Sequence, residues 1–223
     1  MSKKFISIAI DGPSGAGKST VAKGVAKRLG IVYVDTGAMY RAIGLKTIRK
    51  GIPSDDRERV TALLPETDVS LRFDDGVQSV LLDGEDVSGL IRTQEVSNAA
   101  SKVSAIPEVR YKLVELQQKL AKGTSLTMDG RDIGTHVLPN AEYKFYVTAS
   151  PDARTSRRYK ELLEKGTLGD MTFNELLVEM IERDKRDAGR DCMPLKKAPD
   201  ALLIDTTYLG KEESVDAVMK YIK

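Results

Sequence analysis

Short apolar runs alternate with amphipathic segments along the first fifty residues of the chain. Residues 5–10 are mainly apolar and end at an Asp-Gly-Pro turn, which predicts a buried strand. Over residues 19–29, apolar side chains recur at steps of three and four with lysines between them, which predicts a helix. A strand over 31–34 and a helix over 38–50 repeat the order. This rhythm predicts βαβ units around a parallel sheet.

A different pattern interrupts this order in the middle of the chain. Residues 69–73 and 77–83 alternate between apolar and polar side chains on either side of Asp74-Asp75-Gly76. Such alternation around a turn is typical of a β-hairpin and not of a crossover helix. We therefore expect a small antiparallel insert over about residues 65–92.

The remaining patterns return to helices and short apolar strands. We expect helices over 93–105, 107–122, 153–164, 173–186 and 212–222, and strands over 125–128, 143–148 and 201–204. Together with the first elements, they predict an α/β fold with a parallel sheet flanked by helices.

Composition narrows the classes of protein that fit this pattern. The chain has 223 residues with 35 Lys plus Arg and 33 Asp plus Glu, so a net charge of only +2 argues against a protein that coats nucleic acid. No Trp is present, and Cys192 and His136 are the single residues of their kinds, which excludes an intrachain disulfide and a His/Cys zinc cluster. With no long apolar run, we expect a cytoplasmic protein without a membrane segment.

A phosphate-binding motif stands between the first strand and the first helix. Residues Gly12 to Ser19 fit G-x-x-x-x-G-K-[ST] in full, in the strand–loop–helix context that the motif requires. The glycines let successive N–H groups face phosphate oxygens, and the positive end of the helix adds to them. Lys18 can reach the β- and γ-phosphates, and the Ser19 hydroxyl can bind Mg²⁺. The sequence thus predicts a nucleoside triphosphate site.

The motif alone leaves the use of the triphosphate open, because GTPases, motors, helicases and small-molecule kinases share it. The short chain has no second large domain, and it lacks the Asn-Lys-x-Asp motif that reads guanine. Arginines stand near expected strand ends or helix starts, and six more fall within residues 154–190. They are Arg41, Arg110 and Arg131, followed by Arg154, Arg157, Arg158, Arg183, Arg186 and Arg190. This pattern favours a small-molecule kinase.

Guanidinium groups suit phosphoryl transfer to an acceptor that is itself a phosphate. Such an acceptor is already anionic and needs no strong base, so positioning and charge neutralisation carry most of the catalysis. Arginine binds phosphate oxygens in bidentate fashion and stays charged. The alternative for a charged helix is a solvated face with ion pairs, and Arg154 and Arg186 fit either interpretation.

Five segments of the chain carry a likeness to a known family. They are Asp11 to Ser19, Asp35 to Arg41, Ile91 to Ser101, Asp129 to Thr135 and Glu182 to Asp187. In this order they resemble the bacterial cytidylate kinases over nearly the whole chain. The resemblance implies a P-loop kinase fold that transfers a phosphoryl group from ATP, with Mg²⁺, to CMP or dCMP.

The resemblance also implies roles for single residues. ATP would bind Gly12, Pro13, Ser14, Gly15, Ala16, Gly17, Lys18, Ser19 and Thr20, with Mg²⁺ on Ser19. Asp129 ends an apolar strand, where P-loop proteins often place a carboxylate for Mg²⁺, and the alternative is a turn residue at the strand end. The acceptor phosphate would bind Arg41, Arg131 and Arg190. The cytosine would bind Thr36, Ser101, Arg110 and Asp132. The pentose would bind Tyr40, Arg183 and Asp187. Arg157 and Arg158 would lie on a lid over ATP and complete the catalytic set of Lys18 and the phosphate-binding arginines.

The chemistry of cytosine agrees with a carboxylate in this set. Cytosine N4 donates and N3 accepts, whereas the corresponding groups of uracil accept and donate. A carboxylate at Asp132 would accept from N4 and repel uracil O4, while Arg110 or Ser101 could donate to the base. The alternative for Asp132 is a capping or turn residue after Gly130.

The same resemblance sets expectations for domains and partners. It implies a core at 1–64, 106–153 and 191–223, a monophosphate-binding insert at 65–105 and a helical lid at 154–190. We expect a monomer that acts on small molecules, without nucleic acid or membrane. Two alternatives stay open: a kinase for another monophosphate such as UMP, and a P-loop ATPase that remodels a nucleic acid or regulates a partner.

Overall fold

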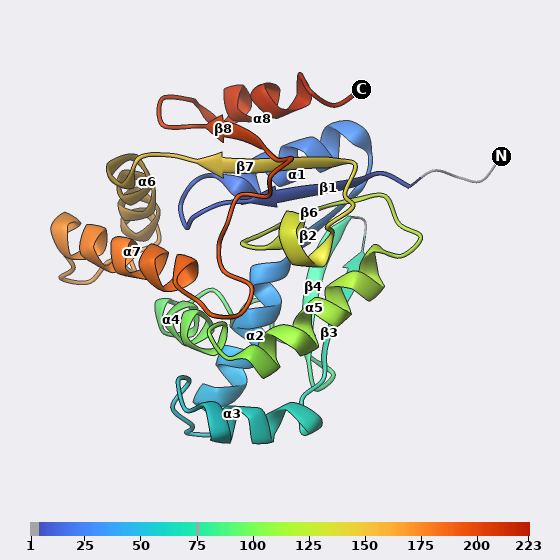
Figure 1. Ribbon diagram of the computed structural model, residues 1–223. Coiled ribbons are helices and arrows are strands. Elements are labelled where there is room, and N and C mark those ends of the chain that lie inside the picture. The colour runs from blue at the N-terminus through green and yellow to red at the C-terminus, as the bar shows by residue number, and fades with distance from the viewer. Residues whose placement is uncertain (1–4, 75) are drawn as a thin grey trace. The chain divides into compact units, whose positions relative to one another are not determined.

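The computed structural model describes residues 5–74 and 76–223 (Figure 1). The chain divides into two compact units, the first formed by 1–32 and 123–223 and the second by 33–122. Asp75, in the expected hairpin turn, lies outside the described residues.

A five-stranded parallel sheet organises the first unit. Its order is β2-β6-β1-β7-β8, with β1 at the centre. The strands are β1 (Ser7–Asp11), β2 (Val32–Asp35), β6 (Leu126–Gly130), β7 (Tyr143–Thr148) and β8 (Leu202–Asp205). Strand β2 starts at the last residue of the first unit and leads into the second.

The central strand β1 is covered on both faces. Ile8 is opposite Thr127 of β6 and Tyr143 of β7, and both neighbours run parallel to β1. Ile8, Ala9 and Ile10 are fully buried, which is why this strand reads as a continuous apolar run and not as an alternation. The predicted first strand and parallel sheet are thereby confirmed.

Four helices and one π-helical turn complete the first unit as far as its residues are described. The helices are α1 (Lys18–Leu29), α6 (Pro151–Glu164), α7 (Phe173–Ala188) and α8 (Lys211–Met219), and the turn is η2 (Ile133–Val137). Figure 1 shows α6 leaving the carboxyl end of β7, with α7 beside it. An apolar cluster of Leu162, Leu176 and Met180 joins α6 to α7.

The second unit is mainly helical, with a small antiparallel sheet. Its helices are α2 (Thr36–Arg49), α3 (Arg57–Leu63), α4 (Gln94–Val103) and α5 (Pro107–Ala121), with a 3₁₀ turn η1 (Leu64–Glu66). Its sheet has the order β3-β4-β5, formed by β3 (Val69–Asp74), β4 (Val77–Leu82) and β5 (Glu85–Asp86). Because β3 and β4 pair antiparallel, the predicted hairpin is confirmed.

Several short elements were not predicted by the periodicity. They are α3, η1, β5 and η2, all of seven residues or fewer. Helix α2 also starts at Thr36, two residues before the predicted start, because the Asp35 side chain accepts a hydrogen bond from the Ala38 N–H and caps the helix.

No helix within residues 5–74 and 76–223 is long and apolar enough to cross a bilayer.

Candidate active site

The phosphate loop follows β1 and opens α1, as the motif predicts. Gly12 has φ +146°, and a Cβ there would lie 1.9 Å from the Val147 carbonyl oxygen. Any larger residue would push the loop off β7. Gly15 has φ +75°, and a Cβ there would meet the Arg154 Cβ at 3.1 Å. The glycines of the motif therefore meet two needs: a left-handed backbone and close packing.

Lys18 is buried at the first position of α1, where its Nζ donates to the Pro13 carbonyl oxygen at 2.7 Å. Burial, with help from the positive charge of Arg131, lowers the pKa of Lys18 to about 7. The lysine therefore sits in an environment that disfavours its charge, and a bound polyphosphate would reverse this balance.

Oxygen donors for a divalent cation lie beside the loop. The Ser19 hydroxyl donates to Asp129 Oδ2 at 2.7 Å, and Asp129 lies near the carboxyl end of β6, 5% exposed. A hydroxyl and a carboxylate are donors that Mg²⁺ accepts, usually together with substrate phosphates and water. The two residues therefore fit the predicted metal.

Asp11, which precedes the loop, connects it to a distant turn. Its two carboxylate oxygens accept from the N–H groups of Ile133 at 2.8 Å and Gly134 at 2.7 Å. Burial raises the pKa of Asp11 to about 7 against the effect of these two hydrogen bonds. Asp11 thus fixes the start of η2, directly after Arg131 and Asp132.

Two of the predicted phosphate-binding arginines meet on one carboxylate. Arg131 Nε donates to Asp187 Oδ2 at 2.8 Å, and Arg190 donates to Asp187 Oδ1. Asp187 is 2% exposed, yet the charges of Arg131 and Arg190 lower its pKa against the effect of burial. Asp187 in turn raises the pKa of Arg131 against the same effect. The carboxylate therefore holds both guanidinium groups in place.

Asp132 is 4% exposed in the segment that Asp11 fixes. It stands at the N-cap position of η2, but its side chain makes no capping hydrogen bond to that turn. The capping alternative therefore does not explain this carboxylate. Arg183 lies half-buried on α7, where its charge contributes to the lowered pKa of Asp187.

The second unit holds its predicted phosphate-binding arginine through Asp35. Arg41 Nη2 pairs with Asp35 Oδ2 at 2.8 Å, and Asp35 Oδ1 caps α2. The hairpin adds a further contact: the Gln78 side chain accepts from the Asp35 N–H at 2.8 Å and donates to the Asp35 carbonyl at 3.2 Å. The insert thus binds the backbone just before Thr36, which is 2% exposed.

Three of the predicted base- and pentose-contacting residues of this unit lie close together around Arg110. Its guanidinium lies 5.5 Å from the Tyr40 ring centroid and donates to the Ser104 carbonyl at 3.1 Å. Ser104 in turn donates to the Ser101 carbonyl at 2.8 Å. Ser101 is 6% exposed, and its Oγ has no hydrogen-bond partner within the described part of the chain. The structure thus brings Tyr40, Ser101 and Arg110 together.

The arginines of α6 differ from one another. Arg157 donates to the Thr206 hydroxyl at 3.1 Å and to the Leu209 carbonyl at 3.5 Å, and Arg158 pairs with Glu161 at 2.9 Å. Arg186 on α7 is exposed, as on a solvated face, whereas Arg154 is 4% exposed. The solvated-face interpretation therefore holds for Arg186 and is wrong for Arg154.

Comparison with known proteins decides the family. The sequence model described as cytidylate kinase matches residues 8–223. The chain belongs to the cytidylate kinase family. A cytidylate kinase of Caldicellulosiruptor bescii is 51% identical to it, over 97% of this chain and 95% of that protein. One of Bacillus subtilis (strain 168) is 46% identical, over 99% and 98%.

Solved structures agree on the fold of this family member. A gluconokinase from Sinorhizobium meliloti 1021 has a TM-score of 0.51 at 14% identity, covering 98% of this chain and 92% of that one. A protein from Eubacterium ventriosum has a TM-score of 0.52 at 14% identity, covering 97% and 98%. The P-loop kinase fold is therefore confirmed.

The comparisons also separate the alternatives left by the sequence. Membership of the cytidylate kinase family favours a small-molecule kinase over a GTPase or a nucleic-acid-remodelling ATPase. Nothing in them supports a kinase for UMP.

Four residues near the predicted site were missed by sequence reasoning. Asp35 had a usable signal, since an Asp before a helical segment is a common N-cap. Asp11 and Gln78 bind backbone groups far away in the sequence, and Asp184 binds Arg154 on another helix. None of these three contacts leaves a local pattern.

Proposed function

We propose that this protein transfers the γ-phosphoryl group of ATP to the phosphate of CMP or dCMP, giving ADP and CDP or dCDP. The observation that carries the proposal is the pair of Arg131 and Arg190 on Asp187. Arg131 also lies close enough to Lys18 to lower its pKa. Membership of the cytidylate kinase family supports cytidine monophosphate as the acceptor.

In the transfer step, an oxygen of the CMP phosphate attacks the γ-phosphorus of ATP. The bond from that phosphorus to the β–γ bridging oxygen breaks, and ADP leaves with this oxygen. Because the acceptor oxygen is already anionic near neutral pH, the step needs no strong general base. Catalysis rests on alignment of two anions and on cationic groups that neutralise the moving phosphoryl group.

We propose that the loop from Gly12 to Thr20 binds the triphosphate of ATP. Its N–H groups and the start of α1 face the phosphates, and Lys18 exchanges its contact with Pro13 for phosphate oxygens. Ser19 and Asp129 would hold Mg²⁺, either directly or through water. Mg²⁺ held there would offset the negative charge of the phosphates.

Arg41, Arg131 and Arg190 are proposed to bind the acceptor phosphate. Arg131 and Arg190 are already fixed on Asp187, so little side-chain entropy is lost when the anion arrives. Arg41 would exchange its half-buried pair with Asp35 for the phosphate. Arginine suits this role since its planar fork matches a phosphate with two hydrogen bonds.

Thr36, Ser101, Arg110 and Asp132 are proposed to bind cytosine. Asp132 would accept from N4, and Ser101 has a buried hydroxyl group able to donate to the base. Uracil would place O4 against the carboxylate and leave these buried groups without suitable partners. Selection against a base that leaves buried polar groups unpaired can reach several powers of ten.

Tyr40, Arg183 and Asp187 are proposed to contact the pentose. Asp187 has capacity for this, because a carboxylate accepts about four hydrogen bonds in total. We also propose that residues 65–105 serve monophosphate binding and that residues 154–190, with Arg157 and Arg158, close over ATP on a core of 1–64, 106–153 and 191–223. Closure would keep water from the γ-phosphate.

A coupled assay that detects ADP tests the proposal with CMP, dCMP, UMP and AMP as acceptors. We expect CMP and dCMP to be the best substrates, and CDP and dCDP to be identified as products. Faster turnover of UMP or AMP would contradict it. ATP hydrolysis stimulated by RNA, with no diphosphate product, would instead support the nucleic-acid ATPase.

The same assay on Asp132→Ala tests the base-binding role. The ratio of kcat/KM for CMP over UMP should fall by about tenfold or more, because the carboxylate that repels uracil O4 is gone. An unchanged ratio would remove Asp132 from base recognition. Lys160→Met, on an exposed position of α6, is the control.

We further propose that the protein acts as a cytoplasmic monomer on small molecules, without nucleic acid or membrane. The near-neutral net charge of +2 supports the lack of a nucleic-acid partner. Light scattering coupled to gel filtration, with and without added RNA, should give the mass of a single chain in both cases.

A further inference from the structure

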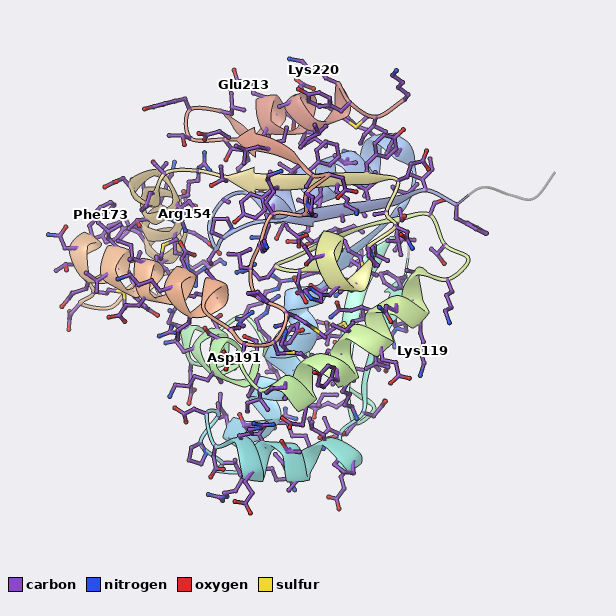
Figure 2. All side chains as sticks on the ribbon, viewed as in Figure 1. Lys119, Arg154, Phe173, Asp191, Glu213 and Lys220 are labelled. Carbon is purple, nitrogen blue, oxygen red and sulfur yellow. The ribbon has the colours of Figure 1, made fainter. Side chains whose placement is uncertain are left out.

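Arg154 on α6 is buried next to the phosphate loop (Figure 2). Its Nε donates to the Ala149 carbonyl at 3.0 Å, and its Nη1 donates to the Ser14 carbonyl at 2.9 Å. Nη1 also pairs with Asp184 Oδ2 at 2.7 Å. One guanidinium thus joins the end of β7, the phosphate loop and α7.

The bond to Ser14 determines which way one peptide group of the loop points. In a trans peptide, the carbonyl of one residue and the N–H of the next point in opposite directions. Because the Ser14 carbonyl is directed to Arg154, the N–H of Gly15 is directed away from Arg154. That N–H belongs to the cradle that the glycine-rich motif forms for phosphate.

A second carbonyl of the loop is bound in the same manner. The Thr206 hydroxyl lies 3.0 Å from the carbonyl oxygens of both Ala16 and Thr148 and shares its proton between them. The Ala16 carbonyl therefore faces Thr206, and the following N–H, that of Gly17, points away from it. Arg157 donates to Thr206 at 3.1 Å. Alternate carbonyls of the loop, at residues 14 and 16, are therefore bound from outside the loop by groups that α6 carries or contacts.

Asp184 keeps the guanidinium of Arg154 in this position. It lies on α7, its side chain is 22% exposed, and that of Arg154 is 5% exposed. A buried charge is stable only when it is paired, so Arg154 depends on this carboxylate. Both residues belong to the segment 154–190, which we propose closes over ATP, and Arg154 connects that segment to the loop.

We propose that Arg154 is a positioning residue for the ATP phosphates, acting through the backbone of the phosphate loop and held in place by Asp184. This rests on the proposed function, since it assigns the loop to ATP. Arg154 touches no phosphate in this role. It directs the Gly15 N–H, and its charge polarises the Ser14 peptide so that this N–H becomes a stronger donor.

Equilibrium binding of ATP and of CMP to Arg154→Met, measured by calorimetry, tests the proposal. We expect the Kd for ATP to rise about 10- to 100-fold, because a hydrogen bond from a charged donor contributes about 1.5–3 kcal/mol. The Kd for CMP should stay within about twofold of wild type. Arg154→Lys, which keeps the charge on a single donor nitrogen, should recover part of the affinity for ATP.

Lys160→Met is the matched control, because Lys160 lies on the same helix with a side chain 78% exposed. Asp184→Asn supplies a second variant if Arg154→Met fails to fold. It keeps Arg154 and removes the charge that holds it, so it should raise the Kd for ATP about three- to tenfold and leave CMP unchanged.

Two results would overturn the proposal. One is an ATP affinity of Arg154→Met or Asp184→Asn equal to that of Lys160→Met. The other is an equal loss for ATP and CMP, which would indicate a general structural defect. Failure of the proposed function is a separate outcome, because wild type would then bind ATP but produce no CDP. The Kd for ATP of Arg154→Met, compared with that of Lys160→Met, would still test the role of Arg154.

Discussion

Two carboxylates hold the candidate phosphate-binding arginines, one in each unit, and their surroundings differ. In the first unit, the side chain of Asp187 is 2% exposed and binds both Arg131 and Arg190. In the second unit, the side chains of Asp35 and Arg41 are 16% and 20% exposed, and Asp35 also caps α2. The Arg131 side chain is as exposed as that of Arg41, so the difference lies in the carboxylates: Asp187 is closed to water, whereas water still reaches Asp35.

The difference indicates how each unit prepares for an anion. Around Asp187 the charges depend on one another, because an unpaired buried charge is costly. Arg131 and Arg190 are therefore fixed before substrate arrives. The partly exposed pair of Asp35 and Arg41 is held more weakly, so Arg41 can exchange partners at little cost.

The largest effect should come from Lys18 in the first unit. Lys18→Ala should lower kcat by about a thousandfold or more, because it removes the charge beside the β- and γ-phosphates. Since burial already disfavours the charge of Lys18, the variant should melt at the same temperature as wild type or above it. Circular dichroism and the coupled assay check both expectations, and near-normal turnover would contradict them.

The stability contrast between Asp187 and Asp35 sharpens the comparison directly. Asp187→Ala leaves the nearly buried guanidinium of Arg190 and the partly buried one of Arg131 without their carboxylate and should cost about 3–5 kcal/mol of unfolding free energy. Asp35→Ala loses a helix cap and a partly exposed ion pair and should cost about 1–2 kcal/mol. Urea titrations give both values, and equal costs would refute the distinction.

A third effect concerns pH and Asp11. Burial raises the pKa of this carboxyl from 3.8 to about 7 in the folded state. At any pH between these two pKa values, folding is therefore accompanied by the binding of a proton. Stability from Asp11 is then fully present below pH 4 and is lost as pH rises toward 7, by about 1.4 kcal/mol per unit. Asp11→Asn cannot ionise, so its stability relative to wild type should increase between pH 5 and 7. A constant difference in urea titrations across this range would contradict the prediction.

The smallest effect is expected from Gln78 in the hairpin. Gln78→Leu keeps the size of the side chain and removes both hydrogen bonds to the Asp35 backbone. Because Asp35 holds Arg41, the KM for CMP should rise about three- to tenfold while the KM for ATP is unchanged. Val77→Thr, at a 67% exposed position on the same strand, is the control. Equal effects of the two variants would show that Gln78 has no positioning role.

Periodicity and motif together predicted the main elements of the fold and the phosphate loop. Strand β1 and helix α1 were predictable because burial on both faces or on one stripe leaves a regular apolar pattern. The single turn η2 has no such pattern, because it is fixed by the Asp11 carboxylate, which accepts from the N–H groups of Ile133 and Gly134 over 120 residues away.

Arg154 shows why the surroundings of the site were harder to predict. Helix α6 is rich in charged residues, so its arginines look alike in the sequence. Arg154 is buried because it binds the Ser14 carbonyl and pairs with Asp184 on another helix. Arg158, about one turn further along α6, pairs with Glu161 on its own helix. Tertiary contacts, and not local composition, separate these roles.

The affinity of Arg131→Met for CMP and for cytidine tests the central claim most directly, which is that preassembled guanidinium groups bind the acceptor phosphate. Wild type should bind CMP about a hundredfold more tightly than cytidine. In the variant, this ratio of the two Kd values should fall by about tenfold or more. The affinity for cytidine itself should not change. An equal loss for both ligands, or none for either, would contradict the account.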